Sequence, residues 1–256
     1  MIDIPLLAII GGALTIGVRL TGLMLFAPFF GSVIIPARIK AIFVIALTVL
    51  LYPSLGHQPV PQSPGGWAML ICTELAIGAG IGIATNLVFE AVQLAGQILG
   101  VQMGYSLVNI LDPQSQVDTT VVALFYQSML MLLFLRMDVH YWLLRAVGNS
   151  YVYLPPGTAH INNLFTVEIF KIVGCLFGLG IQIAAPVLAA TLAADLVLGL
   201  LGKASPQMPL MLLGPPVKSL LGLVILAVTL KYWPDLFSHL FLDSMSKGEQ
   251  LLHMAG

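Results

Sequence analysis

Charged side chains are scarce in this sequence. Lysine and arginine together number 10 and aspartate and glutamate 11 among 256 residues, so 8% of the chain is charged while 59% is hydrophobic. A soluble domain carries about 25% charged residues. The net charge of −1 also lacks the basic footprint that nucleic-acid binding requires. The sequence therefore predicts an integral membrane protein in contact with membrane lipid, and no binding to nucleic acid.

Cysteine, histidine and the common catalytic motifs give no sign of a catalytic or metal site. Cys72 and Cys175 lie far apart, and the five histidines are widely spaced, whereas metal sites need clustered ligands. The sequence contains no G-x-G-x-x-G, G-K-[ST] or H-E-x-x-H motif. Asp195 has no second aspartate in a position typical of an intramembrane protease. We therefore expect no catalytic residue, no metal and no cofactor, and an intramembrane enzyme is the least supported alternative.

The apolar segments predict an all-α membrane protein with long, kinked helices and helical hairpins. They cover residues 6–30, 41–52, 67–103, 121–135, 169–201 and 220–230. A membrane crossing needs about 20 helical residues, so the second and last segments are short for one crossing. The third and fifth are long for one crossing and short for two. Partly inserted hairpins, or helices outside the bilayer plane that pack on protein, would fit these lengths.

Other features refine this prediction. Gly78, Gly80, Gly82 and Pro186 are the expected bend points of the two longest segments. Residues 235–256 form a short, mildly amphipathic tail that could lie along the membrane or on a partner. We expect residues 1–256 to form a single membrane unit.

Polar residues inside the apolar segments need partners. Arg19 lies well inside the first segment, where a cation costs at least about 2.5 kcal/mol on insertion scales. It should pair with an acidic side chain or carbonyl groups, or contact a transported species. Glu90, Gln93 and Gln97 are spaced three and four residues apart and so share one helix face. That face could join helices through hydrogen bonds or form part of a wet lining.

A row of glycines precedes an unusually polar stretch. Gly96, Gly100 and Gly104 recur every four residues, and the same spacing occurs at Gly78 and Gly82 and at Gly174 and Gly178. Small residues at this spacing let another helix backbone approach closely, so these glycines predict close helix packing. After Gly104 the pattern gives way to SLVNILDPQSQVD. Loops of about 15 residues are uncommon in compact proteins unless they are functional or disordered.

Five strings in the sequence, taken in order, resemble the FliR family of flagellar biosynthesis proteins. That family includes the T subunits of virulence-associated type III secretion. The strings are VRLTGLMLFAPFFGSVIIPARIKAIFVIAL (18–47), ELAIGAGIG (74–82), FEAVQLAGQILGVQMGYSLVNILDPQSQ (89–116), ADLVLGLLGKASPQM (194–208) and GPPVKSLLGL (214–223). PQM at 206–208 is closer to the flagellar branch, although the family usually continues with Asn where this chain has Pro209.

The resemblance implies a subunit of a hetero-oligomeric export gate in the flagellar basal body at the bacterial inner membrane. FliP- and FliQ-like subunits would complete this gate, whose helices are largely raised out of the membrane plane. FlhA- and FlhB-like components would support export, and unfolded flagellar proteins would pass through the centre. The loop over 105–119 would act as a plug. Its candidate residues are Tyr105, Ser106, Asn109, Asp112, Pro113, Gln114, Gln116 and Asp118.

A secondary transporter of a small solute is the alternative from a different class. It would use Arg19 and Glu90 as an intramembrane charge pair. Such transporters often consist of two similar halves with broken helices near the midplane, and the two halves of this sequence have no convincing similarity. A transporter should be stable alone or as a homo-oligomer, whereas a gate subunit should need its partners.

Overall fold

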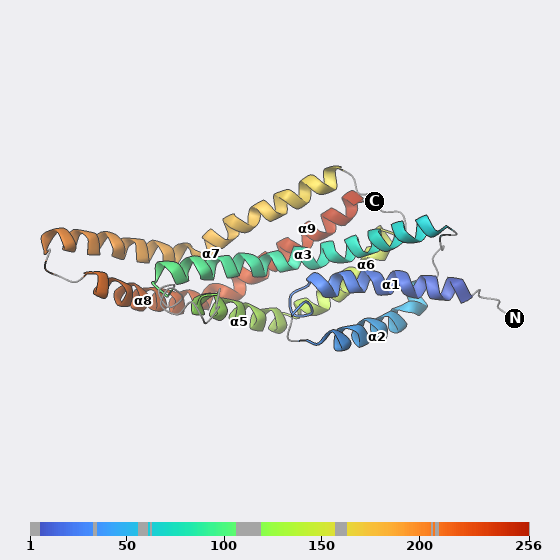
Figure 1. Ribbon diagram of the computed structural model, residues 1–256, viewed down its shortest axis with the longest axis horizontal. Coiled ribbons are helices and arrows are strands. Elements are labelled where there is room, and N and C mark those ends of the chain that lie inside the picture. Colours follow the sequence, from blue (N-terminus) through green and yellow to red (C-terminus); the bar gives the residue numbers. More distant parts are fainter. Residues whose placement is uncertain are drawn as a thin grey trace. The chain divides into compact units, whose positions relative to one another are not determined.

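The regular structure of the protein is helical. The computed structural model describes residues 6–32, 35–55, 61, 63–105, 119–156, 163–205, 207 and 210–255. Within these residues there is no strand, which confirms the all-α prediction (Figure 1). The helices are α1 (Leu6–Phe26), α2 (Ala37–Leu55), α3 (Pro64–Gln102), α5 (Val121–Arg136), α6 (Val139–Tyr153), α7 (Asn163–Ala204), α8 (Leu210–Thr229) and α9 (Trp233–Ala255), with the 3-10 turn η1 (Leu230–Tyr232) before α9.

Several helical stretches are long and apolar enough to cross a membrane. Five occur in the described residues, or six if α5 and α6 together form one broken span. The five are Ile9–Phe26, Ala37–Leu55, Pro64–Gln102, Val173–Ala204 and Leu212–Gly248. The prediction of an integral membrane protein is therefore confirmed.

Two segments that the sequence marked as too short for a crossing are longer than expected. α2 has 19 residues because it begins before Arg38 and Lys40 and includes Pro53 in its last turns. Long basic side chains at a helix end can carry their charge to the polar interface, so they need not end the helix. α8 has 20 residues and includes Pro215 and Pro216. Most of the predicted tail belongs to α9, a helix of 23 residues, and its position along the membrane or on a partner stays a prediction.

The chain contacts divide into two compact units. The first comprises Met1–Val88, Asp138–Val173 and Phe241–Gly256, and the second comprises Phe89–Met137 and Gly174–Leu240. Three helices, α3, α7 and α9, contribute residues to both units. That residues 1–256 act as a single membrane unit stays a prediction.

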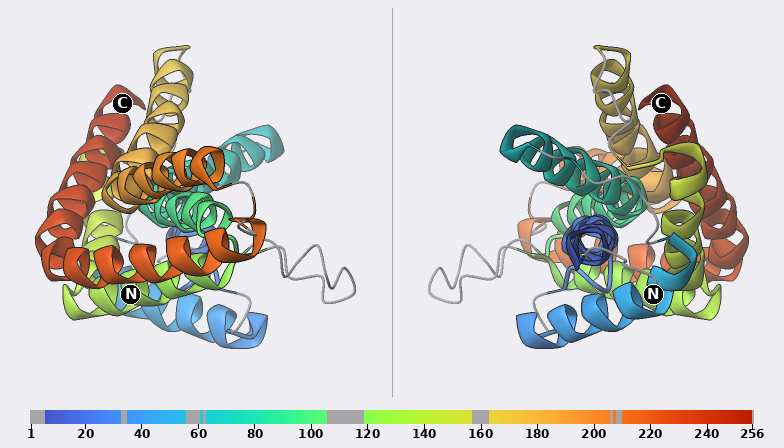
Figure 2. Two further views of the ribbon diagram at one scale, coloured as in Figure 1. Left: turned by 90° about the vertical axis from the view of Figure 1, so that its left-hand side faces the viewer. Right: turned by 90° about the vertical axis from the view of Figure 1, so that its right-hand side faces the viewer.

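Glycine allows close helix packing in the first unit. α1 lies beside α2 (Figures 1 and 2), and it also packs on α3 with almost no space between the backbones. A Cβ atom added at Gly78 would overlap the carbonyl oxygen of Arg19. One added at Gly82 would lie 2.9 Å from the backbone nitrogen of Ala27. The spacing of Gly78 and Gly82 thus corresponds to a real backbone contact.

The second unit contains another contact of this kind, between α3 and α5. A Cβ atom at Gly96 would overlap Ala123, and one at Gly100 would overlap Thr120. Gly174 and Gly178 of α7 have the same spacing, but an added Cβ there would meet no described atom within 4 Å. The repeated spacing in α7 therefore does not mark a packed face in the described part of this chain.

Candidate functional site

The polar stretch after the glycine row begins at a well-defined helix end. The backbone nitrogen of Tyr105 donates to the carbonyl of Gly100 at 2.9 Å, and that of Gly104 donates to Val101 at 3.1 Å. With Gly104 at φ +90°, this is a Schellman motif, in which a left-handed residue ends the helix. Gly104 therefore differs from the two preceding glycines, because it stops α3 in addition to allowing a close approach.

The residues around this helix end are held by α8. The hydroxyls of Tyr105 and Ser219 share a hydrogen bond of 2.7 Å. A Cβ atom at Gly104 would lie 3.0 Å from the Cβ of Pro215, and one at Gly222 would lie 2.6 Å from the terminal methyl of Met103. The last turn of α3 is thus fixed against the middle of α8, between Pro215 and Gly222.

A polar cluster joins the same helix end to α7 and α8. The amide of Gln102 donates to one carboxylate oxygen of Asp195 at 2.7 Å. The ammonium of Lys218 lies 2.9 Å from the other oxygen, with 40% of the Asp195 side chain and 19% of the Lys218 side chain exposed. Asp195 therefore bridges three helices. Partial exposure makes the ion pair a modest contribution to stability, but it orients the residues where the polar stretch begins.

The far end of the polar stretch is also attached to α3. Thr120 is the N-cap of α5, and its hydroxyl accepts a hydrogen bond from the backbone nitrogen of Ala123 at 3.2 Å. The same hydroxyl donates to the carbonyl of Gly96 at 3.2 Å and lies against Gly100. The chain thus returns to α3 close to where it left.

Only the first of the predicted plug residues can be placed. Tyr105 is half-buried in the contact with α8. The others lie outside the described residues, and they are Ser106, Asn109, Asp112, Pro113, Gln114, Gln116 and Asp118.

The conformation of Gly104 gives a first testable expectation. Gly104→Ala should lower the free energy of unfolding by about 1–3 kcal/mol, because a side chain at positive φ is strained and the new Cβ would press on Pro215. Gly214→Ala in α8 is the matched control, since its Cβ would meet no described atom within 4 Å and alanine favours a helix. Thermal unfolding in detergent measures both. Equal midpoints for the two variants would contradict the assigned role of Gly104.

The three polar residues predicted to share a face of α3 do so in the second unit. Glu90, Gln93 and Gln97 all line a groove of about 230 Å³. Gln93 also accepts a hydrogen bond of 2.7 Å from Gln127 of α5. The face therefore takes part in a hydrogen bond between helices and also borders an open groove, so both interpretations of it stay predictions.

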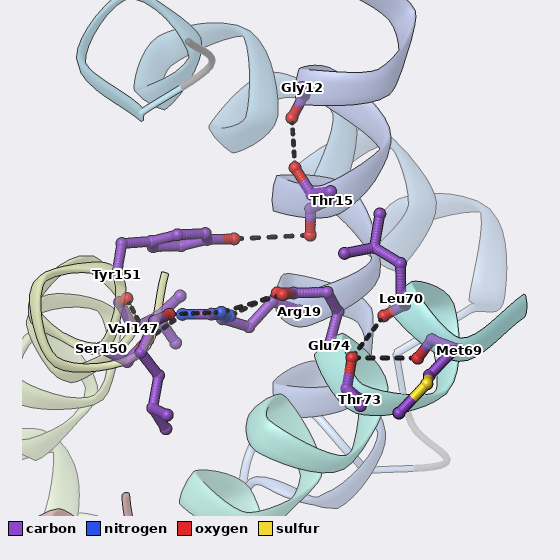
Figure 3. A network of polar contacts seen from close by, with 11 residues as sticks. Gly12, Thr15, Arg19, Met69, Leu70, Thr73, Glu74, Val147, Ser150 and Tyr151 are labelled. Atoms are coloured by element: carbon purple, nitrogen blue, oxygen red, sulfur yellow. Dashed lines mark hydrogen bonds and ion pairs between the residues drawn. The ribbon is translucent and has the colours of Figure 1, made fainter. Parts of the chain in front are cut away.

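Arg19 lies in a fully buried polar network in the first unit (Figure 3). Its Nε donates to Glu74 at 2.6 Å and its Nη2 to the second oxygen of the same carboxylate at 3.1 Å. Nη1 donates to Ser150 at 2.8 Å, and Nη2 also donates to the carbonyl of Leu154 at 3.1 Å. The guanidinium carbon lies 3.8 Å from the centre of the Tyr151 ring. Arg19 thus has both an acidic and a carbonyl partner.

The network ties three helices of the first unit together. Arg19 belongs to α1, Glu74 to α3 and Ser150 to α6, and the Tyr151 hydroxyl donates back to the carbonyl of Thr15 in α1 at 3.4 Å. Arg19 and Glu74 both have 0% of their surface exposed. A paired, buried charge of this kind joins helices.

This network corrects one hypothesis and reveals residues that sequence reasoning missed. The transporter alternative paired Arg19 with Glu90, whereas Arg19 pairs with Glu74. Glu74, Gly78 and Gly82 are spaced four residues apart and so share a helix face, which could have indicated that Glu74 faces α1. The sequence gives less indication of which residues contact the end of α3 near Tyr105. Those residues, Asp195, Lys218 and Ser219, are a few polar side chains within apolar segments.

The known proteins that this chain is similar to all belong to bacterial export systems. The model of the family "Bacterial export proteins, family 1" matches residues 10–244. The flagellar biosynthetic protein FliR of Pectobacterium carotovorum subsp. carotovorum is 30% identical over 226 residues, covering 88% of this chain and 86% of that protein. FliR of Bacillus subtilis is 26% identical over 246 residues, 95% of each chain. The secretion system apparatus protein SsaT of Salmonella typhimurium is 28% identical over 194 residues, 73% of this chain and 74% of that protein.

Proposed function

We propose that this chain is the core channel-forming subunit of the flagellar type III export gate. The chain belongs to the bacterial export proteins of family 1, and within them to the FliR proteins. Membership of the family makes it a membrane component of a flagellar or type III export apparatus, and this family is not one of known enzymes. In the proposal, it conducts unfolded flagellar proteins across the bacterial inner membrane and itself catalyses no reaction.

The attachment of the residues that flank the polar stretch supports the plug assignment, which itself comes from the family resemblance. Residues 106–118 leave α3 at Gly104 and Tyr105, which α8 holds through Ser219 and Pro215. They return at Thr120, which contacts α3 one turn before that exit. A polar segment with both ends fixed side by side on packed helices can project as a unit. This supports the proposal that residues 105–119 close the channel until an export substrate displaces them.

The exposed apolar surface supports the proposed partners. The spanning window of α2 is 0% buried within the chain, and those at Val173–Ala204 and Leu212–Gly248 are 22% and 17% buried. So much apolar helix surface must be covered by lipid or by other subunits. We propose that FliP- and FliQ-like subunits cover part of it in a gate raised out of the membrane plane, and that FlhA- and FlhB-like components act with this gate.

Deletion of residues 106–116 tests the plug directly. The complex that contains the shortened chain should conduct small ions at least about tenfold better than the parent complex in planar bilayers, because a permanently open polar path has no desolvation barrier. The subunit composition of each purified complex must first be shown to be the same.

A Gly/Ser segment of equal length in place of residues 106–116 is the control for chain length. It should give an intermediate conductance if the specific side chains seal the channel. Unchanged ion conductance after the deletion, in a complex of verified composition, would reject the plug. Copurification tests the wider proposal, since a chain that is stable without FliP- and FliQ-like partners would favour a transporter.

A further inference from the structure

The first unit contains a cavity that the proposed export function does not use. It has a volume of about 220 Å³ and is lined by residues of α3, α6 and α9. The inner wall is mostly apolar and is formed by the buried residues Ile81, Ala84 and Leu143. Thr85 is also buried there, and its hydroxyl donates to the carbonyl of Ile81 at 3.5 Å. The cavity is smaller than the roughly 300–1,000 Å³ of drug-sized ligand sites. It could therefore enclose only a part of a larger, partly apolar molecule.

The mouth of the cavity has a different character. Trp142 and Leu242 line it with 50% and 54% of their surfaces exposed. Arg145 and Asn149 line it as well and are exposed. Trp142, Arg145 and Asn149 follow each other at three- and four-residue spacing on α6, so one helix face presents an indole, a guanidinium and an amide together. Tryptophan beside a basic residue is typical of the interface between lipid headgroups and acyl chains.

Among the side chains that the structure describes, the charge at this mouth is positive and has no counter-charge. Arg145 has no ion-pair or hydrogen-bond partner in the part of the chain that the structure describes. No acidic residue lines the cavity. Asp243, which follows the lining residue Leu242 on α9, already pairs with Lys247 at 2.7 Å. An anionic group at the mouth would therefore meet an available guanidinium.

We propose that this cavity binds one anionic phospholipid. Arg145 and the Asn149 amide bind the phosphate, and the first part of an acyl chain lies against Ile81, Ala84 and Leu143. A free phosphate ion would gain nothing from the apolar wall, and an uncharged amphiphile would gain nothing from Arg145. This inference does not depend on the plug.

Bromine-labelled lipids test the site in the assembled complex. Complexes are reconstituted in nanodiscs that contain increasing fractions of brominated phosphatidylglycerol or brominated phosphatidylcholine, and tryptophan fluorescence is recorded. The difference between the parent and Trp142→Phe isolates the signal of Trp142 from all other indoles. We expect phosphatidylglycerol to quench Trp142 at an about fivefold lower mole fraction than phosphatidylcholine, which is the effect of one basic side chain near an anionic lipid.

Substitutions at the mouth and wall make the test specific. Arg145→Gln should abolish the preference, Arg145→Lys should keep most of it, and Arg136→Gln, which changes an exposed arginine outside the cavity, should leave it intact. Gly248→Met should fill the cavity and weaken quenching by both lipids, since Gly248 lines it. Equal quenching by the two lipids in the parent would overturn the proposal. So would a preference that survives Arg145→Gln, or quenching that Gly248→Met leaves unchanged.

Discussion

Arg19→Met should remove most of the folded protein from the membrane, and the double substitution Arg19→Met, Glu74→Gln should restore a large part of it. The single substitution leaves the Glu74 carboxylate buried, with 0% of its surface exposed, and without its bidentate partner. Breaking one side of a buried ion pair costs about 3–5 kcal/mol, a large share of the roughly 5–15 kcal/mol that stabilises a folded protein. Neutralising both partners removes most of that penalty.

Quantitative immunoblots of membranes and of the purified complex measure this effect. Arg136→Met is the matched control, because Arg136 is exposed at the end of α5 and should change the amount of protein little. A double variant no more abundant than Arg19→Met would contradict the pairing argument. Normal assembly of Arg19→Met with altered ion conduction would instead favour contact between Arg19 and a transported species.

Gly78→Ala should destabilise the protein although it adds a single methyl group. The new Cβ would overlap the carbonyl oxygen of Arg19 and lie 3.0 Å from the backbone nitrogen of Leu23, so α1 and α3 would have to separate. Overpacking of this kind costs about 1–3 kcal/mol. The loss should reach the upper end of that range, because Glu74 lies one turn from Gly78 and its contact with Arg19 would be displaced too.

Gly80→Ala provides a control on the same helix with the opposite expected sign. A Cβ at Gly80 would meet no described atom within 4 Å, and replacing glycine by alanine inside a helix stabilises by roughly 0.5–1 kcal/mol. Unfolding midpoints in detergent should therefore fall for Gly78→Ala and stay equal or rise for Gly80→Ala. Two shifts of the same sign would contradict the close contact between α1 and α3.

The sequence predicts which helix faces of this protein lack side chains better than it predicts which other helix packs on each face. The spacing of Gly78 and Gly82 and of Gly96 and Gly100 identifies helix faces without side chains, because helical periodicity is a property of neighbouring residues. The same spacing at Gly174 and Gly178 shows the limit, since periodicity does not say whether another helix covers the face. Gly104 has the right spacing but ends the helix, which depends on its backbone dihedral angle.

In the candidate site, too, the sequence indicates that a residue needs a partner but does not indicate which residue the partner is. The energetic cost of a charge among apolar residues predicts that Arg19 needs a partner. The identity of that partner, 55 residues away, depends on how α1 and α3 pack. Similarly, the polar composition after Gly104 marks a special segment, whereas the contacts of its flanking residues, Tyr105 with Ser219 and Thr120 with Gly96, depend on how the helices pack. The plug assignment depends on resemblance to a family, since composition alone cannot distinguish a plug from a connection.

The attachment of both ends of residues 106–118 to α3 and α8 also bears on how this segment can change in evolution. When a frame holds both ends of a chain segment close together, each doubling of the segment's length costs only about 0.6 kcal/mol in closure entropy. Insertions or exchanges between Tyr105 and Thr120 should therefore leave the helical frame almost untouched. A fluorescent label can therefore be introduced into this segment without loss of the helical frame.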